Sequence, residues 1–231
     1  MNKDLQEAIR IYSIGSHKEL NNFLLDKSKD NLIAIFNDLL TIYINDKNSS
    51  TIREFITTVI SGYMHHETKI GYNGFRQLTI ANNTCEYCEV KPKNIDRIDL
   101  EKYKKGEKKS IQKLNAGGNF TDYTWERFDK DLQSNLNMLI SGFIDGKLIY
   151  IFEFPFKNND FTTKLKKQLE KAFPNRIRKK GVFLRSASFD FKDFIFSNNF
   201  KVNFILKKEE LENYKEFFNG NFYKELIKYA K

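Results

Sequence analysis

Residues 138–154, MLISGFIDGKLIYIFEF, consist of two apolar runs of strand length on either side of an Asp-Gly pair. Asp145 and Gly146 favour a tight turn, so these runs predict two antiparallel strands of one β-hairpin. Upstream, apolar residues recur at three-and-four spacing within residues 29–45 and 51–66, which predicts amphipathic helices with one stripe against a core. We therefore expect an α/β fold with a mixed central β-sheet flanked by helices and a helical N-terminal part.

The rest of the pattern predicts shorter elements within one domain spanning residues 1–231. Residues 1–66 are mainly helical, and Thr51 with Glu54 predicts a capping box at the start of the second helix. The mixed sheet follows over residues 67–231 and includes a hairpin that turns at Asn82 and Asn83. The other expected elements are a lysine-rich loop over 102–113, a helix over about 122–132, a basic helix over 162–173, a strand over 182–194, and a strand from 201 that leads into a terminal helix.

The chain carries 39 Lys and Arg against 30 Asp and Glu, a formal charge of +9, so its surface favours a polyanionic partner. Charge alone leaves both nucleic acid and an anionic membrane open. Residues 162–173 form only a weak amphipathic basic helix, no run reaches the length of a membrane span, and the N-terminus lacks signal-peptide features. We expect a cytoplasmic protein without a membrane partner. Cys85 and Cys88 lack the further ligands that a zinc site needs, so they are expected to be small core residues.

One predicted strand brings an acid and a base to the same face. Successive side chains of a strand alternate sides, so Glu89 and Lys91 of CEVK share a face. Such a carboxylate can hold Mg²⁺, and the lysine can orient or activate the water that attacks a phosphodiester. The same acid-x-lysine spacing begins at residues 67, 107, 145 and 190, and Asp190 with Lys192 is the main rival because it also lies on a predicted strand.

The segment GYNGF, a hairpin and then CEVK resembles the core of the PD-(D/E)xK nuclease superfamily, particularly Type II restriction endonucleases. The resemblance implies a restriction-endonuclease-like fold in which an acidic residue at a bend precedes the hairpin and a Glu-x-Lys pair lies on the next strand. It assigns Asn73, at the position of that acid, and Glu89 as ligands of Mg²⁺, with Lys91 assisting the attacking water. Glu54 corresponds to the glutamate that the family draws from a preceding helix.

Asn73 departs from the family pattern, because an amide oxygen can coordinate a hard cation but contributes no charge. The sequence leaves three explanations open: an Asp-to-Asn substitution that prevents cutting, replacement of the acid by Glu67 or Glu54, or a loss of activity. Structural explanations stand beside the catalytic ones. Asn73 with Gly74 is suited to a bend, and a capping box accounts for Glu54 without chemistry.

Basic and polar side chains downstream of the hairpin are the candidates for contact with DNA. Lysines in a flexible loop bind phosphates without reading sequence, and we assign this role to Lys104, Lys105, Lys108 and Lys109. Arginine, asparagine and serine side chains can read base edges in the major groove. We assign base contacts to Asn119, Thr121, Tyr123, Arg127, Arg185, Ser186 and Ser188.

These features predict a Type II-like restriction endonuclease that hydrolyses phosphodiester bonds in double-stranded DNA at a specific sequence with Mg²⁺. We expect a homodimer, because two-fold protein symmetry matches a palindromic site, and the N-terminal helices are one candidate interface. A structure-selective or repair nuclease of the same fold is the alternative among enzymes. A non-catalytic DNA-binding protein is the alternative from another class.

Overall fold

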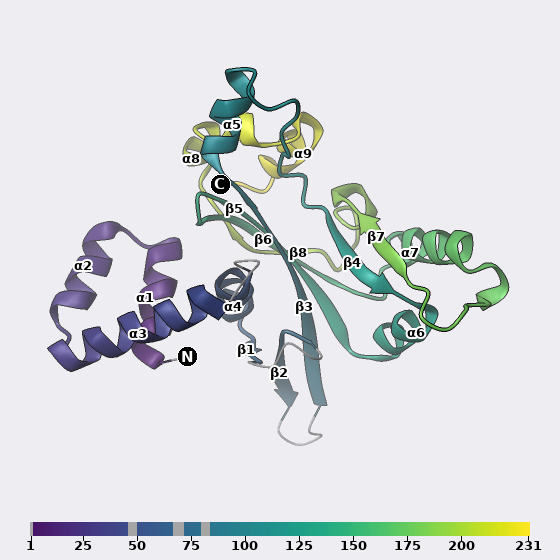
Figure 1. Cartoon of the computed structure of the whole chain (residues 1–231), viewed down its shortest axis with the longest axis horizontal. Coiled ribbons are helices and arrows are strands. Elements are labelled where there is room, and N and C mark those ends of the chain that lie inside the picture. Colours follow the sequence, from purple (N-terminus) through teal and green to yellow (C-terminus); the bar gives the residue numbers. More distant parts are fainter. Residues whose placement is uncertain (1, 46–49, 67–71, 80–83) are drawn as a thin grey trace.

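The computed structural model describes residues 2–45, 50–66, 72–79 and 84–231, and within them the chain forms an α/β fold (Figure 1). Its centre is a mixed β-sheet with the strand order β1-β2-β3-β5-β6-β8. β3 and β5 are parallel, and the other neighbouring strands are antiparallel. The strands of this sheet are β1 (Met64–His65), β2 (Gly74–Thr79), β3 (Thr84–Ile95), β5 (Leu136–Ile144), β6 (Lys147–Pro155) and β8 (Lys201–Ile205).

A parallel pair of strands needs a crossover connection, and the one between β3 and β5 carries three elements. They are α5 (Arg97–Lys104), β4 (Gly118–Tyr123) and α6 (Trp125–Gln133). β4 pairs antiparallel with β7 (Leu184–Phe189) in a separate two-stranded sheet, which we call the β4–β7 ribbon. The ribbon lies beside β3 and packs against one face of the central sheet (Figure 1).

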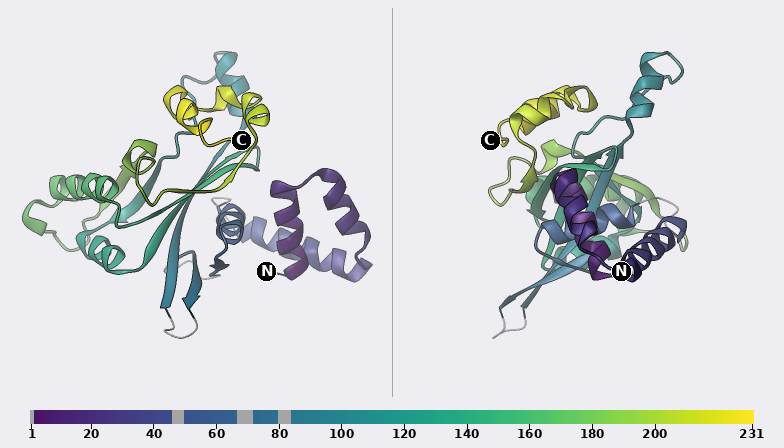
Figure 2. Two further views of the ribbon diagram at one scale, coloured as in Figure 1. Left: turned by 180° about the vertical axis from the view of Figure 1, so that it is seen from behind. Right: turned by 90° about the vertical axis from the view of Figure 1, so that its left-hand side faces the viewer.

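The opposite face of the sheet is covered by α4 (Thr51–Ile60), whose Phe55 and Ile56 share a buried cluster with sheet residues. α1 (Lys3–Ile14) extends this layer. α2 (His17–Leu25) and α3 (Lys29–Asn45) project from the same side, away from the ribbon (Figures 1 and 2).

The ribbon face of the sheet buries a core rich in phenylalanine. Phe120 of the ribbon, Phe128 of α6, and Phe161 of α7 (Asn159–Ala172) are fully buried in it. Phe222 of α9 (Gly220–Leu226) joins the same cluster. Burying one such ring contributes about 1.5–3 kcal/mol, so this core fixes the ribbon firmly to the sheet.

The predicted hairpin at Asp145 and Gly146 is confirmed by the antiparallel pairing of β5 with β6. Asp145 has φ +50° and Gly146 φ +79°, and positive φ at both central residues is what a type I′ turn requires. The predicted basic helix is confirmed as α7, and the predicted strand that begins at Lys201 is confirmed as β8.

Several predicted boundaries were wrong because long-range pairing overrode the local pattern. Met64 and His65 form β1 rather than the end of a helix, since they pair with β2. Residues 118–123 form β4, so residues 122 and 123 belong to a strand rather than to the start of a helix, since β4 pairs with β7. The lysine-rich loop begins later than predicted because α5 extends to Lys104, and the terminal helix is divided into α8 (Lys208–Glu212), a 3₁₀ turn and α9.

Two local predictions were also wrong. The N-cap of α4 is Ser50, which makes no side-chain capping hydrogen bond, so Thr51 is not the cap and Glu54 lies beyond the capping-box position. Asp190 lies after the end of β7 and caps a 3₁₀ turn by accepting a hydrogen bond from the backbone of Lys192 at 2.9 Å. Asp190 and Lys192, the rival acid-x-lysine pair, therefore lie in a turn and not on a strand. Glu67 and the turn at Asn82 and Asn83 lie outside the described residues.

The apolar stripe of α3 is mostly exposed, contrary to the prediction that it faces a core. Ile35 is buried, but Phe36 is 58% exposed and Tyr43 is 73% exposed. Leu32, Leu39 and Leu40 are each more than one-third exposed. The sheet is already covered by α4 and α1, so within one chain α3 has little apolar surface to pack against.

Candidate active site

The predicted catalytic residues lie around residues 89–91 of β3, where one edge of the strand is free of β2. The pairing of β2 with β3 ends at Gly74, which lies opposite Cys88. From Val90 onward, this edge of β3 is therefore not paired with β2. Pro92 suits this position because it has no N–H to leave unpaired. The backbone N–H of Val90 donates instead to the side-chain oxygen of Asn73 at 2.8 Å.

Asn73 connects this strand edge to helix α4. Its side-chain Nδ2 donates to Glu54 Oε2 at 3.1 Å, and its backbone N–H donates to the carbonyl of Cys88 at 2.9 Å. Asn73 therefore occupies the bend before β2, as predicted, and also positions the Glu54 carboxylate beside β3. Two of the residues carried over from the family resemblance, Glu54 of the helix and Asn73 of the bend, are thus joined at the edge of β3.

Glu89 and Lys91 point to the ribbon face of β3, where Glu89 is held by two cations. Lys91 Nζ lies 2.7 Å from Glu89 Oε1, and Arg127 Nη2 of α6 lies 3.3 Å from the same oxygen. The Glu89 side chain is only 9% exposed. Lys91 lies over the ring of Phe120 at 4.8 Å, and the Arg127 guanidinium is 5.5 Å from the centroids of both Phe120 and Tyr123. Aromatic contacts therefore fix both cations around one carboxylate.

A second buried carboxylate, Asp131 of α6, lies behind Arg127. It accepts hydrogen bonds from the hydroxyls of Tyr72 at 3.2 Å and Tyr123 at 3.1 Å, and Arg127 Nε lies 3.9 Å from it. Burial raises the pKa of Asp131 from 3.8 to about 6. Arg127 thus lies between Glu89 and Asp131. From the sequence alone, this side chain was expected to contact the bases of DNA.

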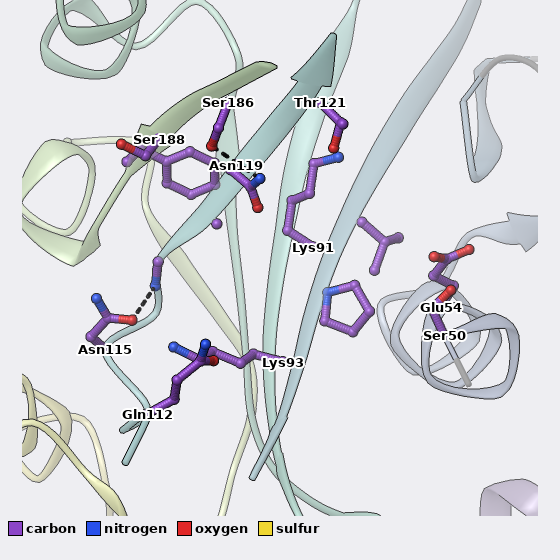
Figure 3. A pocket seen from close by; sticks show the side chains of 15 residues that line it. Ser50, Glu54, Lys91, Lys93, Gln112, Asn115, Asn119, Thr121, Ser186 and Ser188 are labelled. Carbon is purple, nitrogen blue, oxygen red and sulfur yellow. Dashed lines mark hydrogen bonds between the residues drawn. The ribbon is translucent and has the colours of Figure 1, made fainter. Parts of the chain in front are cut away.

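A polar cavity of about 630 Å³ opens beside this cluster, around the edge of β3. Glu54, Lys91 and Lys93 contribute to it from α4 and β3. Figure 3 shows Glu54 and Lys91 on the two sides of β3, with Lys91 directed toward the ribbon. The ribbon contributes Asn119, Thr121, Ser186 and Ser188.

The predicted DNA-contacting residues are therefore distributed over several places. Four of the predicted base readers, Asn119, Thr121, Ser186 and Ser188, line the cavity. Tyr123 is fully buried, so the prediction that this ring contacts DNA was wrong; its hydroxyl is bonded to Asp131. Arg185 is 90% exposed near Asp122.

The predicted phosphate-binding lysines, Lys104, Lys105, Lys108 and Lys109, are exposed on α5 and the segment after it. Lys104 pairs with Glu216, and Lys108 pairs with Asp99. None of the four lines the cavity of the candidate site.

Lys93 and Asn115 line the cavity but were not predicted from sequence. Lys93 donates from Nζ to the carbonyl of Lys113 at 3.0 Å, and burial lowers the pKa of its ammonium group. A sequence signal for Lys93 did exist, because it follows Lys91 by two residues and alternation places both on one face. Asn115 offers no such signal, since its position depends on the crossover between β3 and β5.

The residues carried over from the family resemblance include oxygen donors that already have protein partners: Asn73 Oδ1 accepts from the N–H of Val90, and Glu89 Oε1 accepts from Lys91 and Arg127. Glu54, Asn73 and Glu89 supply oxygen ligands, the type that Mg²⁺ prefers. The described part of the chain has no cluster of three or more His, Cys, Asp or Glu side chains arranged to hold a metal ion. Mg²⁺ is commonly held by one or two carboxylates together with substrate phosphates, so a site built from these residues would need the phosphates of a substrate to complete its ligands.

Comparison with family models, curated proteins and solved structures finds no match to this chain. Among the helices of the described residues, none combines the length and apolar character needed to cross a bilayer.

Proposed function

We propose that this chain is a Type II-like restriction endonuclease of the PD-(D/E)xK superfamily, with a restriction-endonuclease-like fold, and that it hydrolyses double-stranded DNA with Mg²⁺. The observation that carries the proposal is that Asn73, bonded to Glu54, also binds the backbone of β3 at Val90, between Glu89 and Lys91, and that Glu54 and Lys91 line one polar cavity. The arrangement of helix, bend and Glu-x-Lys strand is the one that the sequence resemblance implies.

In the proposed mechanism, Glu89 and the residue at position 73 would hold the metal, and Glu54 would support the residue at position 73 from α4. Lys91, at the cavity wall, orients the attacking water and offsets charge on the phosphate. Arg127 balances the charge of Glu89 and remains close to Asp131. When bound, Mg²⁺ supplies the positive charge that stabilises the phosphorane-like transition state and the leaving oxygen.

The proposed partner in solution is a second copy of the chain, bound through the exposed stripe of α3. Residues 1–45 contain five Lys and Arg against six Asp and Glu, whereas the whole chain carries +9. This near-neutral apolar surface suits a protein partner rather than a polyanion, and two copies meet there without strong charge repulsion. Because α3 projects on the side away from the ribbon, such a dimer leaves the cavity of each chain open.

Incubation with phage DNA and Mg²⁺ tests the proposal, using the chain as it stands and its Asn73→Asp variant. We expect discrete fragments from Asn73→Asp and weak or no cutting from the parent chain. Adding Glu89→Gln or Lys91→Ala to that variant abolishes cutting, while Lys192→Ala, from the rival pair, leaves it unchanged.

Two results contradict the proposal in different ways. A smear without discrete bands favours the structure-selective or repair nuclease. An intact substrate, with DNA binding retained by the Asn73→Asp variant, favours a non-catalytic DNA-binding protein.

A further inference from the structure

The outer face of the β4–β7 ribbon carries a small grid of polar side chains. Asn119 is paired with Ser188 across the two strands, and Thr121 is paired with Ser186. All four are exposed, and Asn119 Nδ2 donates to Ser186 Oγ across the diagonal at 3.1 Å. Each can donate and accept hydrogen bonds, so the grid presents a fixed pattern of polar groups toward the cavity.

The ribbon is rigidly supported from behind. Phe120, Ala187 and Phe189 alternate with the grid residues and are buried in the core. On the outer edge of β7, Gln168 of α7 donates to the carbonyl of Ser188 at 2.8 Å and accepts from its N–H at 2.8 Å. Because these backbone groups are satisfied, the ribbon at this point offers a ligand its side chains and not a free strand edge.

The dimensions of the grid match a major groove. That groove is about 12 Å wide and admits a two-stranded ribbon, whose strands lie about 4.8 Å apart. Side chains on one face of a strand repeat about every 6.8 Å, which equals roughly two base-pair steps of about 3.4 Å. A grid two residues long therefore spans about three base pairs. Asparagine pairs well with adenine, and serine and threonine can pair with several base edges.

The ribbon also approaches the proposed catalytic strand closely. A Cβ atom at Gly118 would lie only 3.1 Å from Lys91 Cβ, so glycine permits this crossing. Lys91 and the grid residues line the same cavity (Figure 3). We infer that the β4–β7 ribbon reads base edges in the major groove, and that the cut phosphate lies within or directly beside the sequence that the ribbon reads. This inference rests on the proposed function and names the element that selects its substrate.

Selection of bound duplexes from a randomised DNA library tests the ribbon without requiring cleavage. The parent chain is used in EDTA and, in parallel, in calcium. We expect it to enrich a short sequence, and the double variant Asn119→Ala/Ser186→Ala to lose that enrichment. The double variant retains its affinity for mixed-sequence duplex, because phosphate contacts are unchanged. Asn198→Ala, an exposed asparagine elsewhere, serves as the matched control and keeps the enrichment.

Replacing purines by 7-deazapurines in the enriched duplex distinguishes base contacts in the major groove from those in the minor groove, since it removes only a major-groove acceptor. We expect binding to weaken by about 5- to 150-fold, the range for loss of a specific base contact. Unchanged binding to that duplex, or enrichment that survives in the double variant, overturns the inference. The second part of the inference places the cut phosphate within or directly beside the enriched sequence. It is overturned if the Asn73→Asp protein produces cut ends that map many base pairs outside that sequence. Enrichment without any cutting overturns the proposed function alone.

Discussion

Asn73 donates its side-chain N–H to the carboxylate of Glu54 across 3.1 Å, at the position where the family pattern has a metal-binding acid. An amide at this position satisfies Glu54 without any cation. An aspartate there would place two carboxylates in contact, an arrangement that is unfavourable unless a cation or a proton lies between them. The same hydrogen bond therefore stabilises the Glu54 carboxylate in the absence of a cation.

The Asn73→Asp variant is expected to make stability depend on Mg²⁺. Without metal, loss of the hydrogen bond and repulsion from Glu54 should lower the free energy of unfolding by about 1–3 kcal/mol. Saturating Mg²⁺ should recover a comparable amount, about 2.7 kcal/mol at a hundredfold excess over Kd. Thermal unfolding with and without Mg²⁺ measures both effects. The parent chain is the control, and an equal Mg²⁺ response in the two proteins would contradict the prediction.

Glu89→Gln is expected to lower the free energy of unfolding, because Lys91 and Arg127 would then face each other without a carboxylate. Glu89 is nearly buried but both cations are partly exposed, so the loss should be about 1–3 kcal/mol. Glu216→Gln is the matched control, since its pair with Lys104 is about half exposed and contributes about 0–1 kcal/mol. Urea unfolding compares the two. Equal losses would show that Glu89 is not held as described.

Asp131 is expected to make the protein less stable as pH rises through about 6. Its folded pKa is raised from 3.8 to about 6 by burial, so the folded chain binds this proton more tightly than the unfolded chain. The favourable contribution is complete below pH 3.8 and is lost as pH passes about 6, a change of about 3 kcal/mol.

Asp131→Asn removes that proton from the folding equilibrium. Asparagine has one acceptor oxygen where Asp131 has two, so the variant loses a hydroxyl contact at every pH, but its stability relative to the parent chain should improve between pH 4 and pH 7. Urea unfolding across this range measures the difference between the two proteins. A difference that is constant with pH would rule out the raised pKa.

The sequence predicted the parts of this molecule that depend on local pattern. The hairpin at Asp145 and Gly146 followed from turn chemistry, and the shared face of Glu89 and Lys91 followed from strand alternation. The approach of Asn73 to Glu54 was expected only from the family resemblance, since neither residue type nor spacing requires it.

The parts that depend on distant contacts were not predictable in the same way. β4 is a strand because it pairs with β7, about sixty residues later in the chain, and GGNFTDYT alone shows no strand alternation. Tyr123 and Arg127 have the residue types of DNA contacts, but packing against α6 and Glu89 decides their positions. Glu54 was attributed to a capping box because Thr51 precedes it at the right spacing, whereas the helix starts from Ser50.

The exposed stripe of α3 gives a prediction about assembly. If a second copy covers it, Phe36→Glu should convert a dimer to a monomer, because a charge would be buried in an apolar interface. The fold of each chain should be retained, since Phe36 is 58% exposed within it. Light scattering coupled to gel filtration measures the mass. Phe196→Glu is the matched control, because Phe196 is 67% exposed outside the N-terminal helices and its replacement should leave the dimer intact. A parent chain that is monomeric at micromolar concentration, or a dimer that survives Phe36→Glu, would contradict the proposed interface.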